Sequence, residues 1–433
     1  MRKTLFTVIL VMILMTATVA MGTVDLKGTN IYVAIRSLPE TDFIISHTSE
    51  FTRQTGIKVH YVLYPELQLR EKEVMDLVSG QGAYDVIALD CVYVSEFAGK
   101  GWLVPLDDLL KPEYDTEDFM TKILDLFRHN GKLYGLPVYS EITHLMYRKD
   151  IFKERGINVP QTFDELEKVA AQLYNPPKLY GIAMRGLRGD GMNVYTWASF
   201  FRGFGGKFFD KDWHPIFNNE VGVKATEYYA DLLRKYGPPG VSSYSWDDVQ
   251  SAFTSGITAM IIDANNFMTR IENPAKSKIV GKIGYALIPA GPAGRFPGIY
   301  SMGLGVSAIG AKTEREKLAS AEFVQWATSY DIQLDSALQL GVVSSARRSV
   351  FNNPAFIARF DNVSYPGWRS STVKSYEVAM PQFRPLIPEW REFGNLLGIA
   401  IEEVISGQKS AKEALDWAAK GTERIMRESG KLK

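Results

Sequence analysis

The chain has 433 residues, of which 46% are hydrophobic, and its 49 Lys and Arg residues balance 49 Asp and Glu residues. This length is too great for one ordinary hydrophobic core, so we expect two domains. The balanced charge excludes the strongly basic surface that binds nucleic acid or an anionic membrane, and we expect neither as a partner. The single cysteine, Cys91, excludes an internal disulfide, so stability must come from packing.

The first residues have the layout of a secretory signal peptide. Arg2 and Lys3 supply a positive start, and the apolar run from Leu5 to Ala20 ends in small residues. The run is shorter than the ~20 residues that a membrane-spanning helix needs. We expect cleavage after Ala20 or Gly22, where no cysteine is present to accept a lipid. The sequence therefore predicts an exported protein, periplasmic or otherwise extracytoplasmic, that is soluble after cleavage.

Strand-like and helical segments alternate after the signal. We predict strands over 31–35, 58–63 and 85–89 and helices over 43–55 and 66–79, the second with an apolar face of Leu67, Val74, Leu77 and Val78. This β-α-β-α-β alternation predicts a mostly parallel sheet covered by helices on both faces. Sheets of this kind bind ligands at the carboxyl ends of their strands.

Three later helices are predicted to begin at capping boxes, in which a hydroxyl and a Glu three residues on satisfy free backbone amides. The pairs are Thr162 with Glu165, Thr313 with Glu316, and Ser410 with Glu413. No long Pro-, Gly- or Ser-rich linker separates the helical segments. Two domains would therefore be joined by short strand-like crossings, an arrangement that suits a hinge.

Metal and nucleophile chemistry both require particular residues close together. The five histidines are never three or four residues apart, and the chain has no His-Glu-x-x-His, Cys-x-x-Cys or Gly-x-Ser-x-Gly motif. Gly303-Leu-Gly305 matches a loose dinucleotide fingerprint, but no helix follows at once, so we interpret it as a small-residue strand crossing. We expect no metal, no cofactor and no catalytic residue.

Aromatic and polar residues occur together in two stretches, Asn193 to Trp197 and Tyr244 to Asp248. A carbohydrate offers an apolar C–H face that stacks on Trp or Tyr, while its hydroxyls need fixed polar partners. Packing in the core is an equally good interpretation of each Trp, because Trp is largely buried in most proteins. The two stretches are candidates for ligand binding only together with further features.

Several blocks in a fixed order carry a resemblance to a known family. They are Tyr84-Asp-Val-Ile-Ala-Leu-Asp90, Gly101-Trp-Leu-Val-Pro-Leu-Asp107, Gly131-Lys-Leu-Tyr-Gly-Leu-Pro137, Tyr147-Arg-Lys-Asp150, Pro160-Gln-Thr-Phe-Asp-Glu-Leu166, Phe253-Thr-Ser-Gly-Ile-Thr-Ala-Met260 and Pro388-Glu-Trp390. With these blocks the mature chain resembles the group 1 extracellular solute-binding proteins of ABC importers, the kin of maltose-binding protein. Residues 180–188, 204–209, 236–240 and 288–294 resemble the polyol-binding subgroup.

The resemblance implies an α/β fold like that of periplasmic binding proteins, with two α/β lobes, three crossover segments and a central ligand cleft. We place the crossings near Val138, Gly303 and Asn353. After a signal peptide of residues 1–22, lobe 1 would comprise 23–138 plus 304–352, and lobe 2 would comprise 139–303 plus 353–433. Each lobe then mixes early and late segments, which accounts for the missing linker.

The resemblance also implies which residues line the cleft. They are Arg36, Glu40, Asp90 and Tyr93 from lobe 1, Glu141 just past the first crossing, Asn193, Trp197, Trp246 and Asp263 from lobe 2, and Tyr300 at the second crossing. Carboxylates would accept hydrogen bonds from neighbouring hydroxyls, Arg36 would donate, and the aromatic rings would cover the carbon skeleton. For Arg36 and Glu40 the alternative is an exposed ion pair.

The predicted function is the capture of a sugar or sugar alcohol by hinge closure, without catalysis, and its delivery to the membrane subunits of an ABC permease by a monomer. Two alternatives remain open. A secreted glycoside hydrolase could draw a carboxylate pair from Asp90, Glu141 and Asp263. A binding protein for amino acids or peptides would need a paired cation and anion across the cleft.

Overall fold

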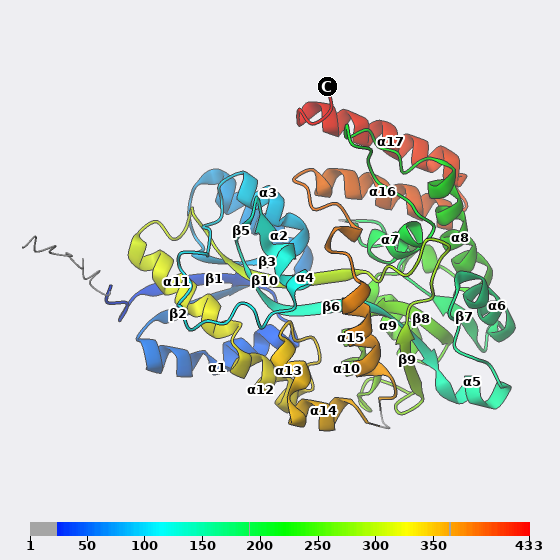
Figure 1. Ribbon diagram of the computed structural model, residues 1–433, viewed down its shortest axis with the longest axis horizontal. Coiled ribbons are helices and arrows are strands. Elements are labelled where there is room, and N and C mark those ends of the chain that lie inside the picture. Colours follow the sequence, from blue (N-terminus) through cyan, green and yellow to red (C-terminus); the bar gives the residue numbers. More distant parts are fainter. Residues whose placement is uncertain (1–23, 190, 363–364) are drawn as a thin grey trace, which may run out of the picture.

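The computed structural model of the protein describes residues 24–189, 191–362 and 365–433 (Figure 1). The predicted signal peptide, residues 1–22, lies outside the described residues. Within those residues no helix combines the length and the apolar character that crossing a membrane requires.

The strands form one mixed sheet in the order β2-β1-β3-β10-β6-β8-β7, with β9 also paired to β6. Their bounds are β1 Asn30–Ile35, β2 Lys58–Leu63, β3 Val86–Asp90, β6 Leu136–Arg148, β7 Tyr180–Ala183, β8 Thr258–Ala264, β9 Ile283–Leu287 and β10 Ile299–Val306. Strand β1 runs parallel to both β2 and β3, as the alternation predicts. The prediction of a mostly parallel sheet is wrong beyond these strands, because β10 is antiparallel to β3 and β6, and β6 is antiparallel to β8 and β9. A separate short ribbon pairs β4, Arg128–His129, with β5, Lys132–Leu133.

Helices gather around the two ends of this sheet and form two α/β lobes (Figure 1). On the side of β1 to β3 the helices are α1 Pro39–Thr55, α2 Glu66–Ser79, α3 Val94–Gly99, α4 Thr121–Leu124, α11 Glu314–Ala327, α12 Tyr330–Leu340 and α13 Arg348–Asn352. Helix α14, Pro354–Phe360, lies between the two groups, because it packs on α12 and α13 and its Phe356 also contacts Trp368. On the side of β7 to β9 they are α5 Lys149–Arg155, α6 Phe163–Leu173, α7 Val194–Gly203, α8 Glu220–Tyr236, α9 Trp246–Thr254, α10 Met268–Ile271, α15 Trp368–Val378, α16 Trp390–Ile405 and α17 Ala411–Glu428.

The predicted apolar face of α2 is partly wrong, and the side chain of Leu67, one of its residues, lies outside the described part of the structure. Leu77 is buried as predicted, but Val78 is 68% exposed. The buried stripe is instead Leu69, Glu73 and Leu77, four residues apart, and it includes a carboxylic acid at 2% exposure. Residues four apart lie on one helical face, so a charged residue between two leucines belongs to the buried side.

Local capping signals are confirmed at the predicted helix starts. The Thr313 and Ser410 capping boxes are complete in the structure. At α6, Thr162 accepts from the backbone N–H of Glu165, but the Glu165 side chain accepts from Gln161 rather than from Thr162. These caps depend on residues within four positions of each other, so the sequence alone specifies them.

Two strands pass from one lobe to the other. Residues 136–142 of β6 pair with β10, whereas residues 143–148 of the same strand pair with β8 and β9. Strand β10 pairs with β3 on its other edge, so it connects the parallel strands of the first lobe to β6. Gly303 lies in β10, which confirms the interpretation of Gly303-Leu-Gly305 as a strand. The third crossing, near Asn353, stays a prediction.

We predict that Gly303→Ala destabilises the protein by about 1–3 kcal/mol, as overpacking of a rigid core does. A Cβ at this position would lie 2.5 Å from the carbonyl oxygen of Leu136 and 2.6 Å from the ring of Phe127. Gly99→Ala is the matched control, because its Cβ would meet only His129, at 3.7 Å. Urea unfolding measures both variants, and equal midpoints would contradict this account of the crossing.

Candidate functional site

A group of charged and phenolic side chains lies where the two lobes meet. Arg36 directly follows β1 and Asp90 is the last residue of β3, so both stand at the carboxyl ends of neighbouring parallel strands. Arg36 Nη2 donates to the Tyr139 hydroxyl at 3.0 Å, and the Tyr300 hydroxyl donates to Asp90. The carboxyl edge of the sheet is where α/β folds bind ligands.

The pairing of β6 with β10 explains why residues far apart in sequence meet here. Tyr300 of β10 is opposite Glu141 of β6, and Met302 is opposite Tyr139. Opposed residues of an antiparallel pair point to the same face, and so do residues two apart on one strand. Tyr139, Glu141 and Tyr300 therefore project from one face of the crossing strands.

The carboxyl group of Glu141 has a pKa near neutral pH. Burial raises its pKa from 4.5 to about 7, and the charges of Asp263 and Glu40 add to this effect, while Arg185 and Arg36 oppose it. Asn266 donates to Glu141 Oε2 at 3.2 Å. Near neutral pH, Glu141 can therefore accept or donate a hydrogen bond.

The second lobe contributes a buried ion pair. Arg185 Nε lies 2.9 Å from Asp263 Oδ2, and its Nη2 lies 2.5 Å from Oδ1. The backbone N–H of Ala264 also donates to Asp263, at 2.8 Å. The Arg185 guanidinium lies over the ring of Tyr195, 4.5 Å from its centroid. Asp263 is fully buried and its oxygens are engaged, so it orients Arg185 as much as it offers an acceptor of its own.

The predicted pair Arg36 and Glu40 is not a solvent-exposed ion pair. Arg36 is only 7% exposed. Glu40 is half-buried and accepts a hydrogen bond from the Ser344 hydroxyl. Burial raises the pKa of Glu40, although Ser344, its own backbone and Arg36 oppose the rise. Both residues thus belong to the site region rather than to the open surface.

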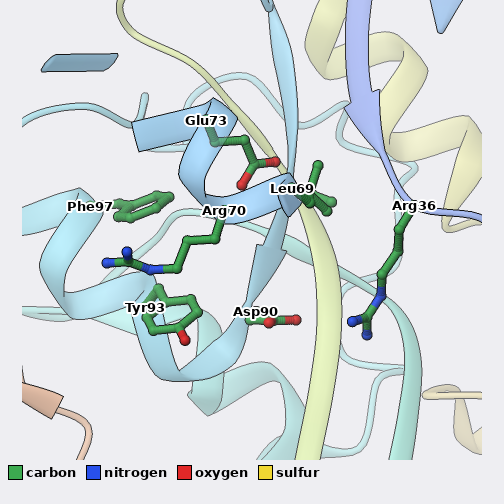
Figure 2. A pocket seen from close by; sticks show the side chains of 8 residues that line it. Arg36, Leu69, Arg70, Glu73, Asp90, Tyr93 and Phe97 are labelled. Atoms are coloured by element: carbon green, nitrogen blue, oxygen red, sulfur yellow. The ribbon is translucent and has the colours of Figure 1, made fainter. Parts of the chain in front are cut away.

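A small pocket opens beside Arg36 and Asp90, between β1, β3, α2 and α3 (Figure 2). It is lined by Arg36, Leu69, Arg70, Glu73, Ala88, Asp90, Tyr93 and Phe97. Figure 2 shows Arg70 between the rings of Tyr93 and Phe97, and its guanidinium lies 4.4 Å from the Tyr93 centroid. Arg70 also pairs with Glu96 at 2.6 Å. The predicted residue Tyr93 is thus at the pocket, where Arg70 covers its ring.

Glu73 is a residue of this pocket that the sequence analysis missed. Burial and the charge of Asp90 raise its pKa well above the usual value. Its Oε1 has no hydrogen-bond partner among the described residues. The signal was present in the sequence, because a Glu four residues from Leu69 and from Leu77 falls on the buried face of α2.

Three predicted site residues lie apart from this group. Trp197 is fully buried in the helical core, where its indole N–H donates to Thr226 at 3.1 Å and its ring stacks on Phe201. Asn193 is also fully buried, and its amide donates to the carbonyl groups of Gly186 and Gly398, both at 2.9 Å. Trp246 is half-buried at the start of α9, with its ring centroid 6.5 Å from that of Phe267. Of the two interpretations of Trp197, packing in the core is therefore the one that agrees with the structure.

The chain is similar to a family of binding proteins and to several of their members. The family profile described as bacterial extracellular solute-binding protein matches residues 39–334. A mannitol-binding protein of Pseudomonas aeruginosa is 29% identical, over 86% of this chain and 87% of its own. A solute-binding protein of an ABC transporter from Agrobacterium radiobacter K84, solved with ribitol, has a TM-score of 0.83 at 28% identity and covers 92% of this chain and 99% of its own. One from Agrobacterium vitis S4, solved with D-mannitol, has a TM-score of 0.81 at 28% identity, with 93% and 99% covered.

We predict that Glu141 makes the free protein less stable as the pH rises from about 4.5 to about 7, the ordinary and the raised pKa of its carboxyl. In this window the unfolded chain releases the proton that the folded protein retains, and above it the loss is complete. The free energy of unfolding of the wild type should fall by a few kcal/mol over this window, since each pKa unit corresponds to about 1.4 kcal/mol. In Glu141→Gln this contribution to the fall should be absent. Other buried carboxyls act in both proteins, so the difference between the two urea-unfolding profiles isolates Glu141. Parallel profiles would contradict the assignment.

Proposed function

The chain belongs to the bacterial extracellular solute-binding proteins, and on this premise we propose that it captures a sugar alcohol or sugar between its two lobes for an ABC importer. The observation that carries the proposal is the group of buried and half-buried acceptors and donors at the junction of the lobes, Arg36, Asp90, Tyr139, Glu141 and Tyr300. Neighbouring hydroxyls of a polyhydroxyl ligand need this mixture of carboxylates, phenols and guanidinium groups. The relatives solved with ribitol and D-mannitol support this ligand class.

The proposed roles follow from position. Arg36, Glu40, Asp90 and Tyr93 act on the ligand from the first lobe. Glu141 and Tyr300 act from the crossing strands, and Asp263 acts from the second lobe together with its partner Arg185. Trp246 packs against Phe267 and has no direct contact with the ligand. Asn193 and Trp197 stabilise the second lobe from within its core.

The mechanism is closure of a hinge. We propose lobes of residues 23–138 plus 304–352 and 139–303 plus 353–433, which rotate about the crossing strands β6 and β10 and a third crossing near Asn353. A ligand that contacts both lobes has a higher affinity for the closed form and shifts the equilibrium toward it. No step of this cycle makes or breaks a covalent bond.

The family and the relatives are binding proteins, and we infer that this chain has no catalytic activity. A glycoside hydrolase needs one carboxylate free to act as base or nucleophile. Asp263 is held by Arg185 and a backbone N–H, and Asp90 accepts from Tyr300. These contacts suit fixed acceptors for ligand hydroxyls.

The proposal also includes the location of the protein and its partners. Residues 1–22 direct export, after which the mature chain is periplasmic or otherwise extracytoplasmic. Its partners are the ligand and the membrane subunits of the permease, to which it presents its closed form as a monomer. The charged amino terminus and the apolar run that follows it support this route.

We predict that sugar alcohols or sugars raise the melting temperature of the ligand-stripped mature protein. A ligand that binds only the folded state stabilises it by mass action, by about 2.7 kcal/mol at a concentration one hundred times its Kd. The panel should include D-mannitol, ribitol, monosaccharides and short oligosaccharides, with amino acids and dipeptides as the contrasting class. A rise with amino acids or peptides alone would overturn the proposed ligand class, and turnover of a glycoside would revive the hydrolase.

A further inference from the structure

Arg384 is one of the buried arginines of the described residues, and it differs even from Arg36, which donates to the Tyr139 hydroxyl. Arg384 is 5% exposed, and it follows the short turn η5, Pro381–Phe383, ahead of α16. Its Nε has no hydrogen-bond partner among the described residues. Arg185 and Arg347 are buried to a similar degree, but each has a carboxylate partner, Asp263 and Asp118 respectively.

Arg384 has no carboxylate within ion-pair distance among the described residues. Burial lowers the pKa of its guanidinium, and the charge interactions that act on it come from Cys91, Tyr195, Tyr300 and Arg185, none of which is a carboxylate. A buried cation without a hydrogen-bonded partner is costly. A ligand that accepts hydrogen bonds from the guanidinium would offset this cost.

Aromatic rings hold the guanidinium in place without engaging its N–H groups. Its central carbon lies 5.3 Å from the centroid of Tyr195, 5.0 Å from that of Phe383 and 5.4 Å from that of Trp390. The face of an aromatic ring attracts a cation but accepts no ordinary hydrogen bond. The donors at the edge of the guanidinium plane therefore stay available in a fixed position.

The segment that carries Arg384 touches both lobes. The Ser95 hydroxyl of α3 donates to the carbonyl group of Leu386 at 2.9 Å, on the first-lobe side. Arg202 of α7 donates to the carbonyl groups of Gln382 and Phe383, at 2.9 and 3.2 Å, on the second-lobe side. Arg384 thus stands at the junction where Tyr300 and the end of β3 meet Tyr195.

We infer that Arg384 is a ligand-binding residue whose guanidinium donates to hydroxyl oxygens of the sugar alcohol or sugar, an inference that rests on the proposed function. Two N–H groups of one guanidinium can donate in parallel, and they match two oxygens on neighbouring carbons. Arg384 therefore selects for ligands with a pair of neighbouring hydroxyls at this end of the site. Together with Arg36 it supplies the donors that complement the carboxylate acceptors.

The test compares Arg384→Met with Arg347→Met in the full mature chain. Met retains an unbranched apolar stem and removes the charge and the donors. For Arg384→Met we expect a free protein at least as stable as the wild type, because an uncompensated buried charge is lost. We also expect the Kd for D-mannitol or ribitol, measured by calorimetry, to rise about tenfold to a hundredfold, as the loss of charge-assisted hydrogen bonds implies.

Arg347→Met is the matched control. Arg347 is 3% exposed, and it donates to Asp118 and to the carbonyl group of Thr328. Its removal leaves the half-buried Asp118 carboxylate with its Ser349 donors but without its cation. This variant should melt at a lower temperature and retain the wild-type Kd within about twofold. A stability loss in Arg384→Met like that of the control, or an unchanged Kd, would overturn the inference.

A second substitution, Arg384→Lys, keeps the charge and replaces the planar fork by a single point donor. We expect it to fold with wild-type stability and to bind with a Kd between those of the wild type and Arg384→Met. Equal binding by Lys and Arg would refute the paired-hydroxyl geometry. If the wild type responds only to amino acids, and Arg384→Met loses that response, the proposed ligand class fails while Arg384 remains a ligand residue.

Discussion

The antiparallel pairing of β6 with β10 is the constraint on which the rest of the structure depends. One half of β6 completes the sheet of the first lobe through β10, and the other half supports β8 and β9 of the second. The lobes therefore share a continuous backbone ladder at the place where the proposed hinge lies. The same pairing places Tyr139, Glu141 and Tyr300 on one face, so the proposed hinge and the candidate site lie on the same two strands.

Burial governs the electrostatics of the site. It raises the pKa of Glu141 to about 7 and that of Glu73 well above its usual range, so these carboxyls are not simple permanent anions. The charges that persist are fixed by contacts within the protein, such as Arg185 with Asp263. A site whose polar groups are already oriented loses little entropy when a ligand binds. Arg384 is the exception, held by aromatic rings but without a hydrogen-bonded partner among the described residues.

Much of the fold could be predicted because its signals are local. The β-α-β-α-β order over residues 30–90 and the capping boxes at Thr313 and Ser410 each depend on residues within one turn or one strand. The face of α2 shows the limit of this approach. The predicted apolar face includes Val78, which is exposed, whereas the buried stripe contains Glu73, whose type of side chain is usually found on the surface.

The sequence by itself determined the alternation of strands and helices, the helix starts and the family, because periodicity, caps and ordered motifs are readable along the chain. Only the tertiary structure decided which polar residues meet. Arg36, Glu141, Tyr300 and Arg384 come from four distant segments, and strand pairing and lobe packing bring them together. It also decided that Trp197 belongs to the core, since an aromatic residue has the same local pattern in a core and in a site. Whether a side chain is buried with a partner depends on contacts that no local pattern encodes.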